Sequence, residues 1–79
     1  YNGLNFAHHK IEIIQPFAFF GLGKITMIQL KNNNLVYIEN NTFSGLVSLE
    51  ELDLRFNLIE TFDLKAFEGL DRLKLISLG

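Results

Sequence analysis

The chain repeats itself every 24 residues. A Phe-x-Gly-Leu motif occurs three times at this spacing, in residues 19–22, 43–46 and 67–70. Alignment on this spacing leaves positions 1, 4, 6, 11, 14, 19 and 22 of every full repeat apolar. Such a period is typical of solenoids, in which each repeat buries its apolar face against its neighbours. We therefore divide residues 1–79 into repeats 1–24, 25–48 and 49–72 and a partial repeat 73–79.

Composition excludes several classes of protein. The 79 residues are 48% hydrophobic, which is too apolar for a disordered segment and is enough for one small domain or part of one. The absence of cysteine excludes a disulfide-stapled mini-domain and a thiolate zinc site. A net charge of −2 does not favour nucleic acid or an anionic membrane surface. No apolar run is long enough to span a bilayer, so we predict no membrane insertion by this segment.

Each repeat is predicted to begin with a short strand. Side chains at positions 4 and 6 point inward, whereas those at positions 3, 5, 7 and 8 point outward, and successive strands pair in parallel. Position 9 holds His9, Asn33 and Asn57, where the chain turns out of its strand. A buried amide there can bond backbone groups that the sheet leaves unpaired, and the ring of His9 is expected to mimic part of this bonding. Phe19, Phe43 and Phe67 should stack on the return side.

One repeat carries a recognisable motif. Residues 49–59 match L-x-x-L-x-L-x-x-N-x-L, so the chain resembles the leucine-rich repeat family. The 24-residue length and the Phe-x-Gly-Leu tail resemble its typical extracellular class, which includes Toll-like receptors, Slit-type proteins, small proteoglycans and lamprey variable receptors. The resemblance implies an α/β-type solenoid: a horseshoe segment with a parallel β-sheet on the concave face and mostly irregular convex returns.

The resemblance also implies a function. It indicates a non-enzymatic protein-recognition module in an extracellular or cell-surface receptor, or in an adhesion or innate-immunity ectodomain. An intracellular or microbial adaptor and a purely structural spacer remain alternatives. Solenoids carry polar or disulfide-bonded caps at their ends, and this chain has neither. We therefore expect an internal segment of a longer ectodomain.

The predicted ligand-binding surface is the concave face. Its expected protein-binding residues are Met27, Gln29, Lys31, Asn32, Glu51, Asp53, Arg55 and Phe56. The carboxylates among them could in principle support acid–base chemistry, but no pocket is predicted around them and Arg55 would neutralise Asp53. We interpret them as a solvated binding face and predict no catalytic residue and no cofactor. Phe56 either offers an exposed ring to a partner or folds over a neighbouring repeat.

Three further features of the sequence give weaker indications of function. The pair His8-His9 lacks other ligands at a recognised spacing, so no metal site is predicted. Asn40 opens an Asn-x-Thr sequon on a return loop and is a candidate for an N-glycan, as in secreted glycoproteins. Phe17 and Phe20 break the pattern on the convex side, either through local packing around Pro16 or as a second interface.

Overall fold

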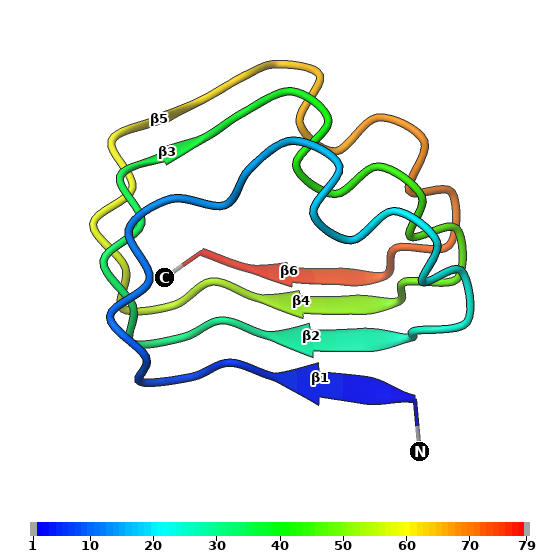
Figure 1. Cartoon of the computed structure of the whole chain (residues 1–79), viewed down its shortest axis with the longest axis horizontal. Helices are drawn as coiled ribbons and strands as arrows, with labels where there is room; N and C mark the ends of the chain where they lie inside the picture. Colours follow the sequence, from blue (N-terminus) through cyan, green and yellow to red (C-terminus); the bar gives the residue numbers. More distant parts are fainter. Residues whose placement is uncertain (1, 79) are drawn as a thin grey trace.

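The computed structural model describes residues 2–78, which wind through successive turns of a coil with a parallel β-sheet as one wall (Figure 1). These residues contain no helix, and the return segments are turns and irregular chain. The strands are β1 (Gly3–Asn5), β2 (Met27–Gln29), β3 (Tyr37–Ile38), β4 (Glu51–Asp53), β5 (Thr61–Phe62) and β6 (Leu75–Ser77).

The main sheet follows the repeat. Its order is β1-β2-β4-β6, all strands are parallel, and each strand is paired with the next at an offset of 24 residues, as in Gly3 opposite Met27 and Met27 opposite Glu51. Every turn of the coil therefore adds one strand at the same register. This arrangement confirms the predicted solenoid with a parallel sheet along one face.

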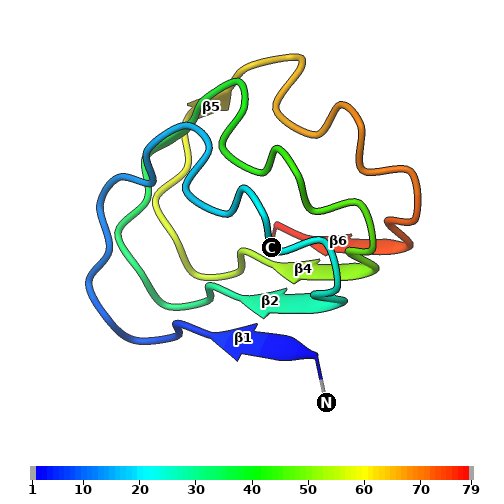
Figure 2. The ribbon, with the colours of Figure 1, turned by 45° about the vertical axis from the view of Figure 1, so that its right-hand side comes forward.

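A second, smaller sheet lies on the return side. β3 pairs in parallel with β5, with Tyr37 opposite Thr61, across the coil from the main sheet (Figure 2). Sequence analysis did not predict these strands. Each is two residues long, so neither has the alternating pattern by which a strand is recognised.

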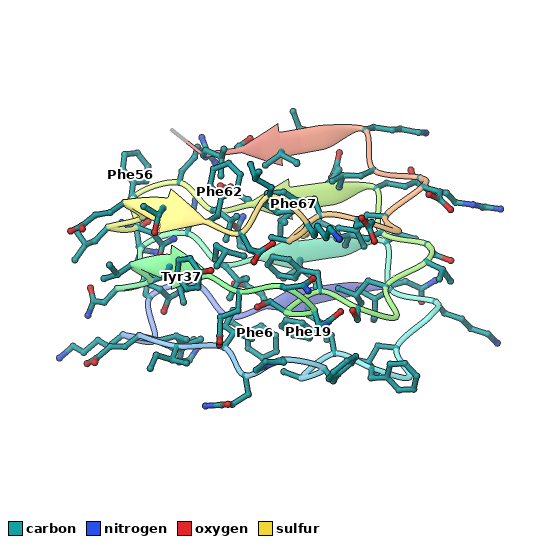
Figure 3. The ribbon with its side chains drawn as sticks, turned by 90° about the horizontal axis from the view of Figure 1, so that it is seen from above. Phe6, Phe19, Tyr37, Phe56, Phe62 and Phe67 are labelled. Atoms are coloured by element: carbon teal, nitrogen blue, oxygen red, sulfur yellow. The ribbon has the colours of Figure 1, made fainter. Side chains whose placement is uncertain are left out.

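The core fills the space between the sheet and the returns. Ile28, Leu30, Leu52 and Leu54, at positions 4 and 6, are buried, as their inward direction predicted. The rings of Phe19 and Phe43 stack at a centroid distance of 6.0 Å and an interplanar angle of 8°, and those of Phe43 and Phe67 at 6.0 Å and 11°. Figure 3 shows Phe19 and Phe67 at the two ends of this stack, which confirms the predicted spine.

The position-9 asparagines join successive repeats. The Asn33 amide oxygen accepts from the backbone N–H groups of His9 (3.1 Å) and Ile11 (3.0 Å) in the preceding repeat. Its Nδ2 donates to the carbonyls of Phe6 and Leu30, both at 2.9 Å. One buried side chain thus satisfies four backbone groups that the sheet does not pair.

Asn57 repeats this pattern with one acceptor bond fewer. Its oxygen accepts from the N–H of Leu35 at 3.1 Å, and its Nδ2 donates to the carbonyls of Leu30 (2.9 Å) and Leu54 (3.0 Å). Both residues therefore have the role that their position predicted.

His9 departs from the expectation. Its side chain is exposed, and within residues 2–78 its ring forms none of the hydrogen bonds seen for the two asparagines. An imidazole ring cannot place a donor and an acceptor side by side as an amide does. His9 contributes only its backbone N–H, which donates to Asn33.

We expect Asn33→Ala to lower the free energy of unfolding by about 1–3 kcal/mol, because the substitution leaves buried backbone groups without partners. Asn57→Ala should cost less, since Asn57 is partly exposed and accepts one bond fewer. Denaturant titration monitored by circular dichroism measures both. The control is Asn34→Ala, which changes an exposed neighbour and should have little effect. Equal losses at positions 33 and 34 would contradict the assigned role.

Candidate functional site

The outward side chains of the main sheet line a shallow hollow of about 290 Å³. Five of the eight predicted binding residues meet there, together with three that lie beside them. The predicted residues are Met27, Gln29, Glu51, Asp53 and Arg55, and the additional ones are Leu52, Leu75 and Ser77. The parallel register brings them together, because it places equal positions of successive repeats in rows across the sheet.

An ion pair organises the charged part of this hollow. Arg55 Nε donates to Asp53 Oδ1 at 2.9 Å, and Arg55 Nη2 donates to Asp53 Oδ2 at 2.7 Å. This hydrogen-bonded guanidinium holds the pKa of the Asp53 carboxyl below its usual value, and the carboxylate raises the pKa of Arg55 in turn. The fork geometry fixes the direction of both groups before any partner arrives.

The side chains at position 5 have a structural role that sequence analysis missed. In each of the first three repeats, the side-chain oxygen accepts from the backbone N–H two residues later. The pairs are Asn5 with Ala7 (3.0 Å), Gln29 with Lys31 (3.4 Å) and Asp53 with Arg55 (3.1 Å). A polar residue at this position therefore helps the strand to end, whether or not it also contacts a ligand.

Two other carboxylates flank the Asp53–Arg55 pair. Glu50 forms an ion pair of 3.3 Å with Lys74 at the edge of the sheet, and both side chains are well exposed. Glu51 is exposed and belongs to neither ion pair found within residues 2–78. Glu51 is therefore the negative charge of this face that a basic partner group can meet without displacing a resident cation.

Asn32 and Phe56 lie apart from this hollow, in the turns where the strands end. His8, Asn32 and Phe56, at position 8, have φ angles of 62°, 59° and 60°. They border a second hollow, of about 360 Å³, with Lys10, Asn33 and Asn34. Lys31, the remaining predicted residue, lines neither hollow.

Phe56 occupies a conformation that its residue type disfavours. A left-handed φ suits glycine and asparagine, and it costs a bulky L residue about 1–2 kcal/mol. The side chain is 62% exposed, and none of the ring–ring contacts within residues 2–78 involves it. Figure 3 shows the ring at the edge of the molecule. Most of the ring is therefore accessible to a partner, and the ring borders the second hollow beside Asn32 of the neighbouring repeat.

Sequence analysis missed Leu75, Ser77, His8 and Lys10 as lining residues. The first two stand at positions 3 and 5 of the partial repeat, and His8 stands at position 8, so the same rule that selected Met27 and Asn32 could have found them. Lys10 could not be found in this way. It is the only residue at position 10 with a positive φ (58°) within the described chain.

The features of the return side are exposed. Asn40 lies in a turn with an accessible side chain. Phe17 and Phe20 pack edge to face at 6.2 Å and 77°, and both rings stay largely in solvent. Local packing is thus present between the two rings, and it does not bury them.

The described residues offer few other kinds of site. Between residues 2 and 78, no group of three His, Asp or Glu side chains is arranged to hold a metal ion. No helix in that range is long and apolar enough to cross a membrane.

Comparison with known proteins gives consistent matches along the chain. The model of the family described as "Leucine rich repeat" matches residues 2–59 and again 26–79. The chain is 35% identical over 72 residues to leucine-rich repeat-containing G-protein coupled receptor 5 of Rattus norvegicus (91% of this chain, 8% of that protein). It is 31% identical over 77 residues to Toll-like receptor 3 of Bos taurus (95% and 8%). It is 44% identical over 55 residues to lumican of Gallus gallus (68% and 16%). The chain therefore spans a small part of the length of these curated relatives.

The ion pair between Asp53 and Arg55 predicts how the Asp53 carboxyl titrates. Its pKa should lie below 3.8, because the guanidinium stabilises the charged form. Since the folded-state pKa is the lower one, the stabilisation by this pair is present above the unfolded value and is lost as pH falls through the folded value. A carboxyl-carbon NMR titration measures the pKa. In Arg55→Gln it should rise towards 3.8, and an unchanged value would contradict the pairing.

Proposed function

Because the chain belongs to the leucine-rich repeat family, we propose that it is a non-enzymatic recognition segment that holds a protein partner on its main sheet and strand-end turns. The relatives include two that are receptors by name, which supports a place in an extracellular or cell-surface protein. Their far greater length supports an internal position in a longer chain. The apolar hollow of about 250 Å³ at the first repeat, lined by Phe6, Ile11 and Phe19 among others, supports the same proposal.

The observation that carries the proposal is Phe56. A largely exposed aromatic ring in a left-handed turn costs folding free energy and buries only a minor part of its area within the chain. Aromatic rings are enriched among the residues that dominate protein interfaces, because they bring large area with few rotatable bonds. Phe56 directly follows Arg55, in the turn after the strand that carries Glu51 and Asp53, so an apolar anchor and oriented charges lie close together along the chain.

The form of the surface favours a protein over a small molecule. The sheet hollow is small, open and lined by charged and long flexible side chains, whereas small-molecule sites are enclosed and mostly apolar. The third repeat also carries most of the negative charge, with seven acidic and three basic residues between positions 49 and 72. This charge supports a partner with basic groups near the third repeat.

We expect Phe56→Asn to weaken binding by about 1–3 kcal/mol, mainly through faster dissociation. The same substitution should leave thermal stability unchanged or higher, because asparagine tolerates this φ and already stands at position 32. Glu51→Lys should instead slow association and alter its salt dependence. Surface plasmon resonance of the full-length protein against a panel of secreted and cell-surface proteins provides the measurement.

The matched control is Leu64→Ser, which removes an exposed apolar side chain from the return side. It should leave both rate constants unchanged. A partner whose binding is insensitive to Phe56→Asn and Glu51→Lys would move the interface away from this face. The absence of any protein partner in the panel would favour the structural-spacer alternative.

We also propose that Asn40 carries an N-glycan. Its side chain is exposed in a turn, and Thr42 completes the sequon. The Thr42 side chain is 1% exposed and its hydroxyl has no hydrogen-bond partner in the described chain. A transferase that must reach this hydroxyl can do so only before the repeat closes, so attachment would precede folding.

Mass spectrometry of the protein secreted from animal cells tests the glycan. We expect the peptide containing Asn40, after enzymatic deglycosylation, to be about one mass unit heavier than its unmodified sequence, because release of the glycan converts the asparagine to aspartate. Asn40→Gln should abolish the modification, whereas Asn41→Gln should retain it because the sequon remains. An unmodified Asn40 in the secreted protein would contradict this proposal.

A further inference from the structure

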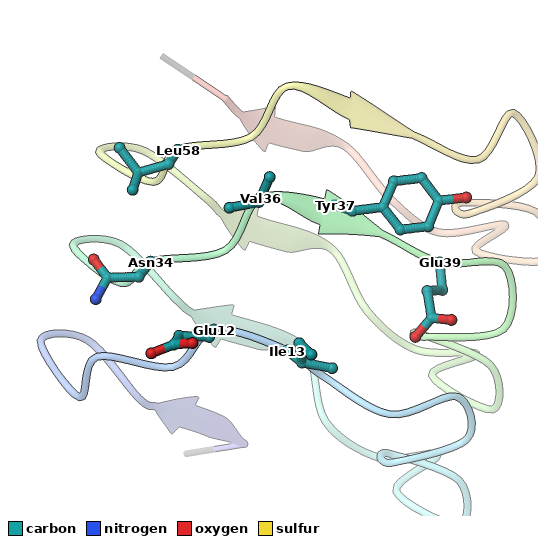
Figure 4. A pocket seen from close by; sticks show the side chains of 7 residues that line it. All are labelled: Glu12, Ile13, Asn34, Val36, Tyr37, Glu39 and Leu58. Carbon is teal, nitrogen blue, oxygen red and sulfur yellow. The ribbon is translucent and has the colours of Figure 1, made fainter.

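A groove of about 810 Å³ opens on the flank of the coil, between the return segments of the first and second repeats. It is distinct from both hollows of the proposed binding face, and only Asn34 is shared with one of them. Ile13 also borders the apolar hollow at the first repeat. Figure 4 shows the groove from close by. Its lining residues are Glu12, Ile13, Asn34, Val36, Tyr37, Glu39 and Leu58.

The groove exists because two neighbouring return segments separate. The returns of the second and third repeats are held together by the β3–β5 pairing and by the N–H groups of Glu60 and Asp63, which donate to Val36 and Ile38, each at 2.9 Å. Between the first and second repeats, the backbone bonds are Asn34 N–H to Ile11 (2.9 Å) and Phe17 N–H to Asn41 (2.8 Å). Within the described chain, no backbone hydrogen bond joins the two segments in between.

The first return also differs from the next two in its backbone. Lys10 has a positive φ, whereas the residues at the equivalent position, Asn34 and Leu58, do not share it. Ile13 does not pair with Tyr37 as the second and third repeats pair, and β3 remains the edge of its sheet.

The floor of the groove is apolar and in contact with water. Ile13 and Leu58 are 67% and 60% exposed, and Val36 and Tyr37 are also exposed. Covering such a contiguous set of side chains is favourable at about 25 cal/mol per Å² of apolar area. Exposed clusters of this kind mark interaction surfaces, unlike single exposed apolar residues.

The two carboxylates of the groove specify the charge of its occupant. Glu12 and Glu39 lie on either side of Ile13 (Figure 4), and no lysine or arginine is among the lining residues. Neither glutamate belongs to an ion pair within residues 2–78. An apolar floor between two free carboxylates complements an apolar segment bounded by two cations.

We propose that this groove docks an extended segment of a partner protein that places apolar side chains over Ile13 and Tyr37 and a lysine or arginine against each of Glu12 and Glu39. The proposal goes beyond the recognition function assigned to the main sheet, since it uses a different face and a different pattern of chemistry. A second copy of this chain is a poorer occupant, because the chain itself is net negative.

The experiment is an NMR titration of the full-length protein, labelled with nitrogen-15 in this segment, with the capped peptide acetyl-Lys-Leu-Phe-Leu-Lys-amide. We expect the amide signals of residues 12–13 and 36–39 to shift, and the affinity to fall as sodium chloride is raised. The matched peptide acetyl-Glu-Leu-Phe-Leu-Glu-amide should leave these signals unchanged. Shifts centred on β2 and β4, or no shifts at all, would overturn the proposal.

The first test variant uses residues that other repeats carry at the same positions, so we expect it to fold normally. Ile13→Thr with Leu58→Asn places the residues of equivalent positions in other repeats, Thr61 and Asn34, into the groove, and should weaken binding about tenfold. Glu12→Gln with Glu39→Gln should weaken it about threefold to fivefold and remove most of the salt dependence. Leu64→Ser is the control and should have no effect. An equal loss of peptide affinity in Leu64→Ser would overturn the assignment of the peptide site to this groove. Signal shifts that grow with protein concentration in the absence of peptide would also overturn it, because they would mean that a second copy occupies the groove.

Discussion

The side-chain amide at position 9 is the interaction on which the rest of this structure depends. A strand only three residues long cannot end by itself, because the backbone groups that follow it point into the protein without partners. Asn33 and Asn57 supply those partners and reach across to the preceding repeat at the same time. They therefore help to set where β2 and β4 stop and how the second and third repeats sit on the repeats before them.

Position 8 has the same backbone geometry in all three repeats. Its residue is left-handed whether position 9 is an asparagine or, as in the first repeat, a histidine that forms none of the amide bonds. The solenoid therefore fixes the conformation at position 8 and leaves the identity of the side chain free, as the set of His8, Asn32 and Phe56 illustrates. By contrast, the residue at position 5 is constrained by the backbone N–H that its oxygen accepts. Differences between the proteins that use this frame should therefore be freer at positions 3 and 8 than at position 5.

The repeat period predicted the main sheet, the buried rows and the phenylalanine stack, because each depends on contacts that recur at the same position in every repeat. Features that belong to a single repeat could not be predicted in this way. The pairing of Tyr37 with Thr61 depends on how closely two return segments approach, and the groove beside Ile13 lies where the first two return segments do not pair in this way. For the candidate site, the sequence identified the outward rows but not the division between the sheet hollow and the strand-end turns, which arises from the turn at Phe56.

The phenylalanine stack also bears on the curvature of a longer array. Adjacent strands of a sheet lie about 4.8 Å apart, whereas the centroids of the stacked rings are 6.0 Å apart. The repeats are therefore spaced about 1.2 Å more widely at the ring centroids than at the strands. A difference of this sign favours bending of the array towards the sheet, which brings the outward side chains of distant repeats closer together. Such an arc fits a rounded partner better than a flat one.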